Sequence, residues 1–214
     1  MSNQIKQLGD IGFEVQNVKT PYLLQQLLKS AFPDIEIISG EDCVTLYAPN
    51  QTINIADMQE IVSKIDDVEA QPVSTQEIVI PCCYDPTLGF DINAAARALS
   101  ITPQELIHHH TSNQFQVQMM GFIPGFGYLS GLPDQLKLDR KTTPLPKVPK
   151  GSVAISRNYT CIYPQEAPGG WHIIGRTPIS IFKPMDQNSF LFSPGTVVSF
   201  RPISIDEFNL FADD

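Results

Sequence analysis

Two segments in the second half of this 214-residue chain concentrate glycine, proline and aromatic residues. They are GFIPGFGYLSGL, residues 121–132, and YPQEAPGGWHIIGRTP, residues 163–178. Glycine reaches positive φ and allows close backbone approach, whereas proline fixes φ and removes a hydrogen-bond donor. Neither a regular helix nor a regular strand accommodates that mixture. We therefore expect loops of imposed shape, with aromatic walls, around a cleft.

Short apolar stretches separated by turn residues surround these two segments. From residue 114 to 119 glutamines alternate with apolar residues, which is typical of a half-buried strand. Further strands are expected at residues 152–156, 160–163, 171–174, 179–182 and 196–202. Many short strands between Gly- and Pro-containing turns favour a closed or sandwiched β domain.

The first eighty residues follow a different pattern, in which strands alternate with amphipathic helices. The expected strands are residues 12–18, 35–39, 44–48 and 77–81, and the expected helices are residues 21–32 and 55–65. The resulting order, β-α-β-β-α-β, matches a small ferredoxin-like unit. A linker is expected at residues 68–75. We predict an α+β chain with one domain at residues 1–77 and a second at residues 78–214.

Two further helices are expected between these regions. Asp91 stands where it can cap a helix over residues 92–99, and Thr102 with Glu105 forms a capping box that begins a helix ending near His110. The pair resembles a helix-turn-helix, but it lacks a basic recognition helix. The chain has 14 Lys and Arg against 23 Asp and Glu, a net charge of −9, which argues against nucleic-acid binding.

The sequence also argues against a membrane protein. It has no apolar run near the ~18 residues that span a bilayer. The N-terminal residues MSNQIKQLGD lack the apolar core of a signal peptide. A cytoplasmic location is therefore expected.

Positive charge gathers in one part of this acidic chain. Residues 137–183 contain eight Lys and Arg but only two acidic residues, Asp139 and Glu166, which is a net charge of +6. Such a cluster favours an anionic ligand, such as a carboxylate or a phosphate. We expect Arg140, Lys147 and Arg176 to line one pocket. The alternative is that these bases are solvated loop residues spread over the surface.

No complete catalytic or metal site of a known type is visible in the sequence. The run His108-His109-His110 does not suit a metal ion, because neighbours on a helix point about 100° apart. The four cysteines, Cys43, Cys82, Cys83 and Cys161, have no C-x-x-C spacing, and we expect them to be reduced. There is no nucleophile elbow and no phosphate-binding loop.

The candidate site residues are therefore polar and aromatic side chains near the turns. The candidate catalytic residues are His110, Glu166 and Arg176, and the candidate substrate-binding residues are Phe126, Tyr128, Arg140, Lys147, Tyr163, Trp171 and His172. Arg176 has a planar fork suited to a carboxylate or a phosphate. His110 either donates to a ligand or caps a helix end, and Glu166 is a general base, an Arg partner or a loop anchor. Trp171 either stacks on a ligand or is buried in the barrel wall.

In order and spacing, GFIPGFGYLSGL, VPKGSVAIS, IYPQEAPGGW and IGRTP resemble the allophanate hydrolase subunit 1 family. That family includes the B subunit of bacterial 5-oxoprolinase and the sporulation kinase inhibitor of bacilli. The resemblance is strong from about residue 80 to 203 and looser before that. It implies a cyclophilin-like β-barrel behind the small N-terminal domain.

The resemblance also implies an activity and partners. A partner resembling allophanate hydrolase subunit 2, the C subunit of 5-oxoprolinase, is expected as a separate protein. Together with an A subunit, the assembly is expected to cleave 5-oxoproline to glutamate using ATP, with no tightly bound metal. This chain is then inactive alone. The alternative is a non-catalytic regulator that holds an extended segment of a histidine kinase in an aromatic groove formed by Phe126, Tyr128 and Trp171.

Overall fold

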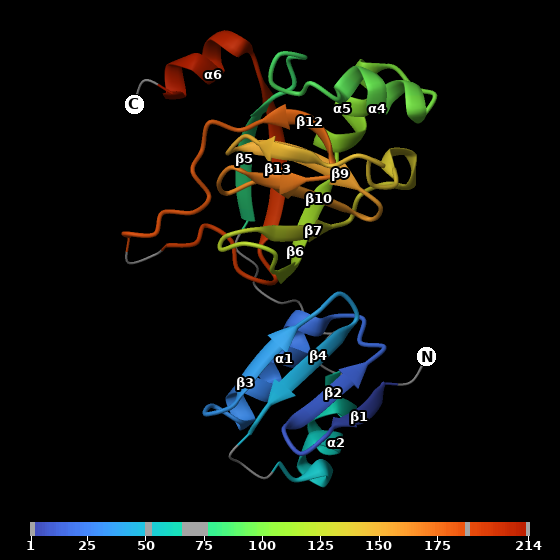
Figure 1. Ribbon diagram of the computed structural model, residues 1–214, viewed down its shortest axis with the longest axis vertical. Helices are drawn as coiled ribbons and strands as arrows, with labels where there is room; N and C mark the ends of the chain where they lie inside the picture. Colours follow the sequence, from blue (N-terminus) through green and yellow to red (C-terminus); the bar gives the residue numbers. More distant parts are fainter. Residues whose placement is uncertain (1–2, 50–52, 66–76, 187–188, 213–214) are drawn as a thin grey trace. The chain divides into compact units, whose positions relative to one another are not determined.

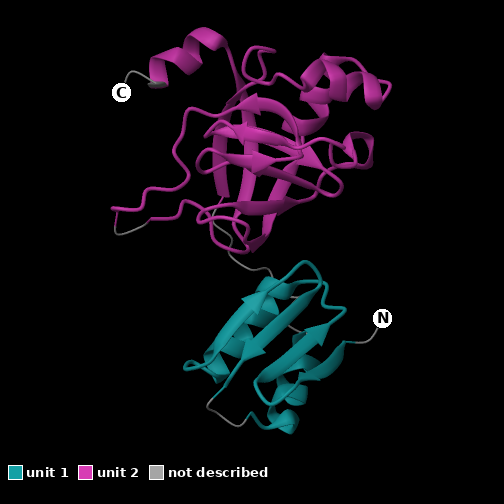
Figure 2. Cartoon of the chain, viewed as in Figure 1, with its two compact units in different colours: residues 1–74 teal, residues 75–214 magenta. Residues whose placement is uncertain are grey.

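The computed structural model describes residues 3–49, 53–65, 77–186 and 189–212 (Figure 1). The chain divides into two compact units, Met1–Ser74 and Thr75–Asp214 (Figure 2). The linker expected at residues 68–75 lies outside the described residues. The boundary expected between residues 77 and 78 falls within strand β5 (Glu77–Cys83) of the second unit.

In its described residues, the first unit consists of an antiparallel four-stranded sheet and two helices. In chain order the elements are β1 (Gln4–Leu8), β2 (Gly12–Gln16), α1 (Pro21–Ala31), β3 (Glu36–Ser39), β4 (Cys43–Tyr47) and α2 (Ile55–Ser63). Across the sheet the order is β1-β2-β4-β3. Helix α1 packs against β3, β4 and α2, and it buries Leu23, Leu24 and Leu28 of its apolar stripe.

This element order differs from the predicted β-α-β-β-α-β. The expected last strand, residues 77–81, belongs to β5 and pairs in parallel with β13 (Val197–Ile203) in the second unit. The edge of the first sheet beside β2 is occupied instead by β1, which the sequence analysis did not predict. Strand β1 reads QIKQL and is mostly exposed, so it lacks the apolar alternation that identifies a half-buried strand.

A closed barrel forms the second unit, and its strands run around the barrel in the order β10-β7-β6-β13-β5-β12-β9. The strands not yet bounded are β6 (Gln114–Met120), β7 (Gly127–Ser130), β9 (Ser152–Ser156), β10 (Tyr159–Ile162) and β12 (His172–Arg176). The other elements are α4 (Ile92–Ala98), α5 (Pro103–Thr111), η1 (Asp134–Leu136), β8 (Leu145–Val148), β11 (Ala167–Gly169) and α6 (Ile205–Ala212). Strands β8 and β11 pair as a separate two-stranded sheet. The β-barrel expected for this region is therefore observed.

Strands β9 and β10 are covered on both faces. Val153, Ile155 and Ile162 belong to the main core, which draws apolar residues from every strand of the barrel. The alternate residues Ala154 and Cys161 belong to a second, smaller cluster. Because successive strand residues point to opposite faces, the main core fills the barrel and the second cluster lies on its outer surface.

All but one of the helices and strands expected in the second unit are observed, but β8, β11, α6 and β7, which lies within the segment expected to be a loop, were not predicted. The capping box of α5 is present: Thr102 Oγ1 accepts from the Glu105 N–H at 3.2 Å, and the Glu105 carboxylate accepts from the Thr102 N–H at 2.7 Å. The strand expected at residues 179–182 is wrong, since only an isolated bridge joins Phe182 to Phe190. There the Thr177 hydroxyl accepts from the Ile179 N–H, so side chains compete with a strand ladder for the backbone.

Candidate functional site

A cavity of about 250 Å³ lies on the outer face of the barrel, beside the second cluster. Its lining combines aromatic rings, prolines, two adjacent glycines and one charged side chain. The lining residues are Phe122, Phe126, Tyr128, Arg140, Pro144, Tyr163, Pro168, Gly169, Gly170 and Trp171. Five of the ten candidate site residues therefore meet here, from segments that are far apart in the sequence: Phe126, Tyr128, Arg140, Tyr163 and Trp171.

The aromatic walls are built around Phe126, which is only 2% exposed. Its ring meets those of Tyr128, Tyr163 and Trp171 at centroid distances of 5.0, 5.4 and 5.9 Å, each edge to face. This is a preferred aromatic geometry, and each contact restrains its partner. The walls are therefore rigid, and the cavity is shaped before any ligand arrives.

Glycines set how closely the backbone approaches this cavity. A Cβ on Gly169 would lie 2.1 Å from the Tyr163 hydroxyl oxygen, so β11 can lie against that hydroxyl only with glycine there. Gly125 has φ +82°, and a Cβ on it would lie 2.7 Å from Cβ of Phe182. The turn at residues 121–125 therefore depends on Gly125, as the sequence led us to expect for its loops.

The polar side chains that line the cavity include one cation, Arg140, and the hydroxyl of Tyr163. Burial raises the pKa of Tyr163, and the positive charge of Arg140 opposes part of that rise. Tyr163 is therefore an uncharged phenol that both donates and accepts hydrogen bonds, and Arg140 supplies the positive charge. Apolar walls with one guanidinium suit a small ligand that carries one negative charge and an apolar ring.

Lys147 and Glu166 lie outside the cavity. They form an ion pair of 3.1 Å, with side chains 76% and 56% exposed. Lys147 lies on β8, and Glu166 precedes β11, so the pair joins the two strands of the small sheet on their solvent side. Glu166 is therefore paired with a lysine at the solvent-exposed surface, and it is not among the residues that line the cavity.

The two other polar candidates on β12 are also bound to backbone groups elsewhere. His172 Nε2 is 2.9 Å from the carbonyl oxygen of Asp139, and Arg176 Nε donates to the carbonyl oxygen of Lys150 at 2.8 Å. Arg176 ends the strand that Trp171 precedes, and it is not among the cavity residues. Of the three bases expected to line one pocket, Arg140, Lys147 and Arg176, only Arg140 lines this cavity.

His110 lies in the barrel interior, where it is 0% exposed. Its Nδ1 is 2.8 Å from the Tyr84 hydroxyl and its Nε2 is 2.9 Å from Thr160 Oγ1. Its ring also packs against Phe115 and Phe200. Burial lowers the pKa of His110 to about 3. A catalytic role for His110 does not agree with this position, because no substrate reaches a fully enclosed ring.

Most bases of the cationic stretch are paired with acids. The pairs are Lys137 with Asp134 at 2.6 Å, Lys141 with Asp91 at 2.7 Å, Lys147 with Glu166 at 3.1 Å, Arg157 with Asp139 at 3.7 Å and Lys183 with Asp186 at 3.9 Å. Two of these acids, Asp91 and Asp134, precede the stretch in sequence. The net charge of residues 137–183 therefore overstated the free positive charge of the folded surface.

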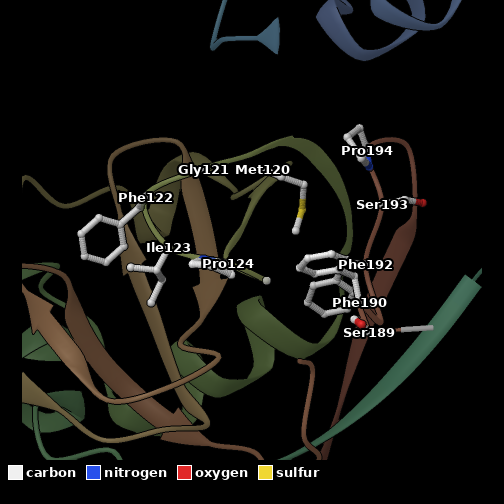
Figure 3. A pocket seen from close by; sticks show the side chains of 11 residues that line it. Met120, Gly121, Phe122, Ile123, Pro124, Ser189, Phe190, Phe192, Ser193 and Pro194 are labelled. Carbon is white, nitrogen blue, oxygen red and sulfur yellow. The ribbon is translucent and has the colours of Figure 1, made fainter. Parts of the chain in front are cut away.

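A larger apolar groove of about 750 Å³ adjoins the cavity (Figure 3). Figure 3 shows Phe122 and Ile123 on one side of it and Phe190 and Phe192 on the other. Phe122 lines both hollows and has φ 69°, which is unusual for a bulky residue. The side of the groove formed by Phe190 and Phe192 was not predicted, although FLFSPG is a third segment that mixes aromatics with Pro and Gly.

In the parts of the chain that the structure describes, no cluster of three or more His, Cys, Asp or Glu is placed to hold a metal ion. The thiols of Cys82 and Cys161 are enclosed, and burial raises the pKa of each. Neither is therefore activated as a nucleophile. Among the described helices, none has the length and hydropathy needed to cross a membrane.

The chain matches a known family and is similar to named proteins. Residues 8–192 match the family model described as "Carboxyltransferase domain, subdomain C and D". The B subunit of 5-oxoprolinase from Bacillus subtilis is 34% identical over 158 residues, which cover 74% of this chain and 65% of that protein. The protein of the same name from Escherichia coli O157:H7 is 32% identical over 169 residues, covering 78% of each chain.

Among solved structures, that of the protein TTHA0988 superposes with a TM-score of 0.75 at 25% identity. The match covers 94% of this chain and 40% of that one. The chain thus spans less than two thirds of the length of the Bacillus subtilis relative and of TTHA0988.

Proposed function

Because the chain belongs to the family of carboxyltransferase domains described as subdomain C and D, we propose that it is the B subunit of a bacterial ATP-dependent 5-oxoprolinase. The relatives that carry the name of this subunit support the assignment. The observation that carries it is the cavity of about 250 Å³, with aromatic walls and the guanidinium of Arg140. The enzyme would cleave 5-oxo-L-proline to L-glutamate.

The cavity matches the chemistry of this substrate. 5-Oxo-L-proline is a five-membered lactam that carries one carboxylate. We propose that its ring lies against the wall formed by Phe126, Tyr128 and Trp171, and that its carboxylate binds Arg140, with the Tyr163 hydroxyl as a second polar contact. A small, rigid, water-poor site of this kind orients the lactam for attack.

The energetic difficulty of the reaction explains the need for partner proteins. A lactam opens slowly in water, and phosphorylation of its carbonyl oxygen makes the ring carbon electrophilic. A nucleotide is too large for a cavity of about 250 Å³, and the described residues include no phosphate-binding loop. We propose that the A and C subunits supply or share the ATP site, so that this chain is inactive alone.

Reconstitution with separately purified A and C subunits tests the proposal. We expect ATP hydrolysis that depends on 5-oxo-L-proline when all three proteins are present, and its loss when this chain is omitted. Arg140→Ala in the complete assembly should raise the KM for 5-oxo-L-proline about 100-fold, as expected for removal of a charged hydrogen-bond donor. Undiminished turnover in the absence of this chain would refute the assignment.

The alternative function, regulation of a histidine kinase, is not favoured. The relatives reported above carry the 5-oxoprolinase name, and the aromatic residues expected to bind an extended kinase segment surround a cavity of about 250 Å³. We therefore do not propose it.

A further inference from the structure

Arg140, which carries the positive charge of the cavity, lies between two residues whose backbone groups are hydrogen-bonded to another segment. Directly before Arg140, the carbonyl oxygen of Asp139 is 2.9 Å from His172 Nε2. Directly after it, the Lys141 N–H donates to the carbonyl oxygen of Gly170 at 2.7 Å. Gly170 itself lines the cavity. The backbone on either side of Arg140 is thus fixed to the segment that leads into β12.

A carboxylate from another part of the chain reinforces this attachment. Asp91 Oδ2 accepts from Lys141 Nζ at 2.7 Å and from the Ile173 N–H at 2.9 Å. The Asp91 N–H in turn donates to the Ile173 carbonyl oxygen at 2.9 Å. The loop that delivers Asp91 lies directly against β12, since a Cβ on Gly89 would be 2.3 Å from the carbonyl oxygen of Ile174.

The carboxylate of Asp91 does not cap helix α4, which is the role predicted for it from the sequence. Asp91 does occupy the N-cap position of α4, but its side chain makes no capping hydrogen bond there. Capping by Asp ordinarily stabilises a helix by about 1 kcal/mol. Helix α4 lacks this stabilising hydrogen bond, because the Asp91 carboxylate is bound to the Ile173 N–H of β12 and to Lys141 instead.

The Asp91–Lys141 pair differs from the other ion pairs of the cationic stretch. Its side chains are 19% and 18% exposed, compared with 56% and 76% for Glu166 and Lys147. A partly buried charge is retained only where a partner compensates for its lost hydration, so this contact is held in one geometry. An exposed pair such as Lys147–Glu166 is not held in one geometry, because water can solvate each charge separately.

We infer that the Asp91–Lys141 ion pair positions Arg140, the residue that binds the substrate carboxylate. This inference rests on the proposed function for the identity of the substrate. Arginine has many rotamers and a planar fork, so its affinity for a carboxylate depends on how well its backbone is held. Asp91 and Lys141 do not line the cavity, and they act only through Arg140 and the segment around it.

Trp171 provides a readout that does not depend on catalysis. It is the only tryptophan of the chain and it lines the cavity. Its fluorescence in the purified 214-residue chain should respond saturably to 5-oxo-L-proline. Pyrrolidin-2-one, the same lactam without the carboxylate, is the matched probe, and we expect it to bind about 10-fold more weakly or worse because it leaves Arg140 unpaired.

The variants then separate positioning from general stability. Asp91→Asn retains an oxygen for the Ile173 N–H but loses the ionic contact, and Lys141→Met loses it from the other side. Both should weaken 5-oxo-L-proline binding about 10-fold and leave pyrrolidin-2-one binding unchanged, as expected when a charged hydrogen bond is misplaced. Lys141→Arg should restore most of the affinity. Lys147→Met, which removes the exposed pair, is the control and should bind as the wild type does.

A double-mutant cycle with Arg140→Ala gives the decisive outcome. If the pair acts through Arg140, then adding Lys141→Met to Arg140→Ala should weaken binding no further. Additive losses, equal losses for both probes, or no saturable response to 5-oxo-L-proline would overturn the inference. Failure of the 5-oxoprolinase assignment would give a different result from failure of this inference. In that case the reconstituted enzyme is inactive towards 5-oxo-L-proline, while carboxylate-selective binding that depends on Lys141 persists.

Discussion

Polar groups on the two faces of the sheet around strands β9 and β10 differ in what they bind. Inside the barrel, Thr160 Oγ1 donates to the carbonyl oxygen of Ala154 at 3.1 Å, so it accepts from His110 Nε2. His110 Nδ1 then accepts from the Tyr84 hydroxyl. On the outer face, Tyr163 and Arg140 border a hollow. The interior polar groups thus satisfy one another and serve stability, whereas the outer ones are available to a ligand.

The comparison shows why residue type alone is a poor guide to function. Histidine is the side chain most often suited to proton transfer near neutral pH. Here burial lowers the pKa of His110 to about 3, and the ring remains neutral. The positive charge that borders the cavity belongs to Arg140 instead, a side chain that ordinarily stays charged at every physiological pH.

The largest effect is expected from removal of the interior histidine, His110. His110→Ala leaves a void among aromatic rings and deletes two buried hydrogen bonds, so we expect a loss of about 3–5 kcal/mol in the free energy of unfolding. Urea denaturation measures it. His108→Ala, at an exposed position of the same histidine run, is the control and should lie within about 0.5 kcal/mol of the wild type. A small effect of His110→Ala would refute its structural role.

The second prediction concerns pH. The pKa of His110 is lower in the folded protein than its ordinary value of 6.5, so only the unfolded chain takes up this proton as the pH falls from 6.5 towards about 3. The contribution to stability is full above pH 6.5 and declines by about 1.4 kcal/mol per pH unit below it.

Comparing unfolding curves across this pH range isolates the effect. His110→Gln should lose this component of the pH dependence, and His108→Gln should keep it. Equal slopes for the wild type and His110→Gln would show that the histidine is not held neutral in the folded state.

On the outer face, substitutions at the adjacent Gly169 and Gly170 should differ in effect. Gly169→Ala places a Cβ 2.1 Å from the Tyr163 hydroxyl oxygen, whereas the nearest atom to a Cβ on Gly170 is 3.7 Å away. We expect Gly169→Ala to reduce stability by about 1–3 kcal/mol by overpacking and to abolish the Trp171 response to ligand. Gly170→Ala should change neither property greatly. Similar behaviour of the two variants would contradict the close approach of β11.

The smallest effect is expected at the exposed pair. Glu166→Gln removes the contact with Lys147, which water already screens, so the free energy of unfolding should change by less than about 0.5 kcal/mol. Turnover of the reconstituted enzyme should also be unchanged, because Glu166 lies outside the cavity. A large loss of turnover at unchanged stability would restore Glu166 as a candidate general base.

Several features of the fold and site follow from local sequence. The capping box of α5 and strand β9 are set by neighbouring residues and were predicted, as was a glycine-bent loop in the segment that contains Gly125. Four of the five aromatic residues of the cavity were also candidates, because rings crowded against Gly and Pro are seldom needed by a core, but Phe122 was not. Strand β1 was missed because an exposed edge strand has little apolar alternation.

The chain's own sequence therefore determined most of the elements, the glycine-dependent loops and most of the aromatic walls, since these depend on contacts over a few residues. Tertiary structure alone decided that β5 joins the barrel, that His110 faces inward, and that Arg140 rather than Lys147 or Arg176 reaches the cavity. The physical reason is that closure of the barrel joins distant segments, such as Asp91 with Lys141 and His110 with Thr160. Local periodicity contains no information about which partners such closure will bring together.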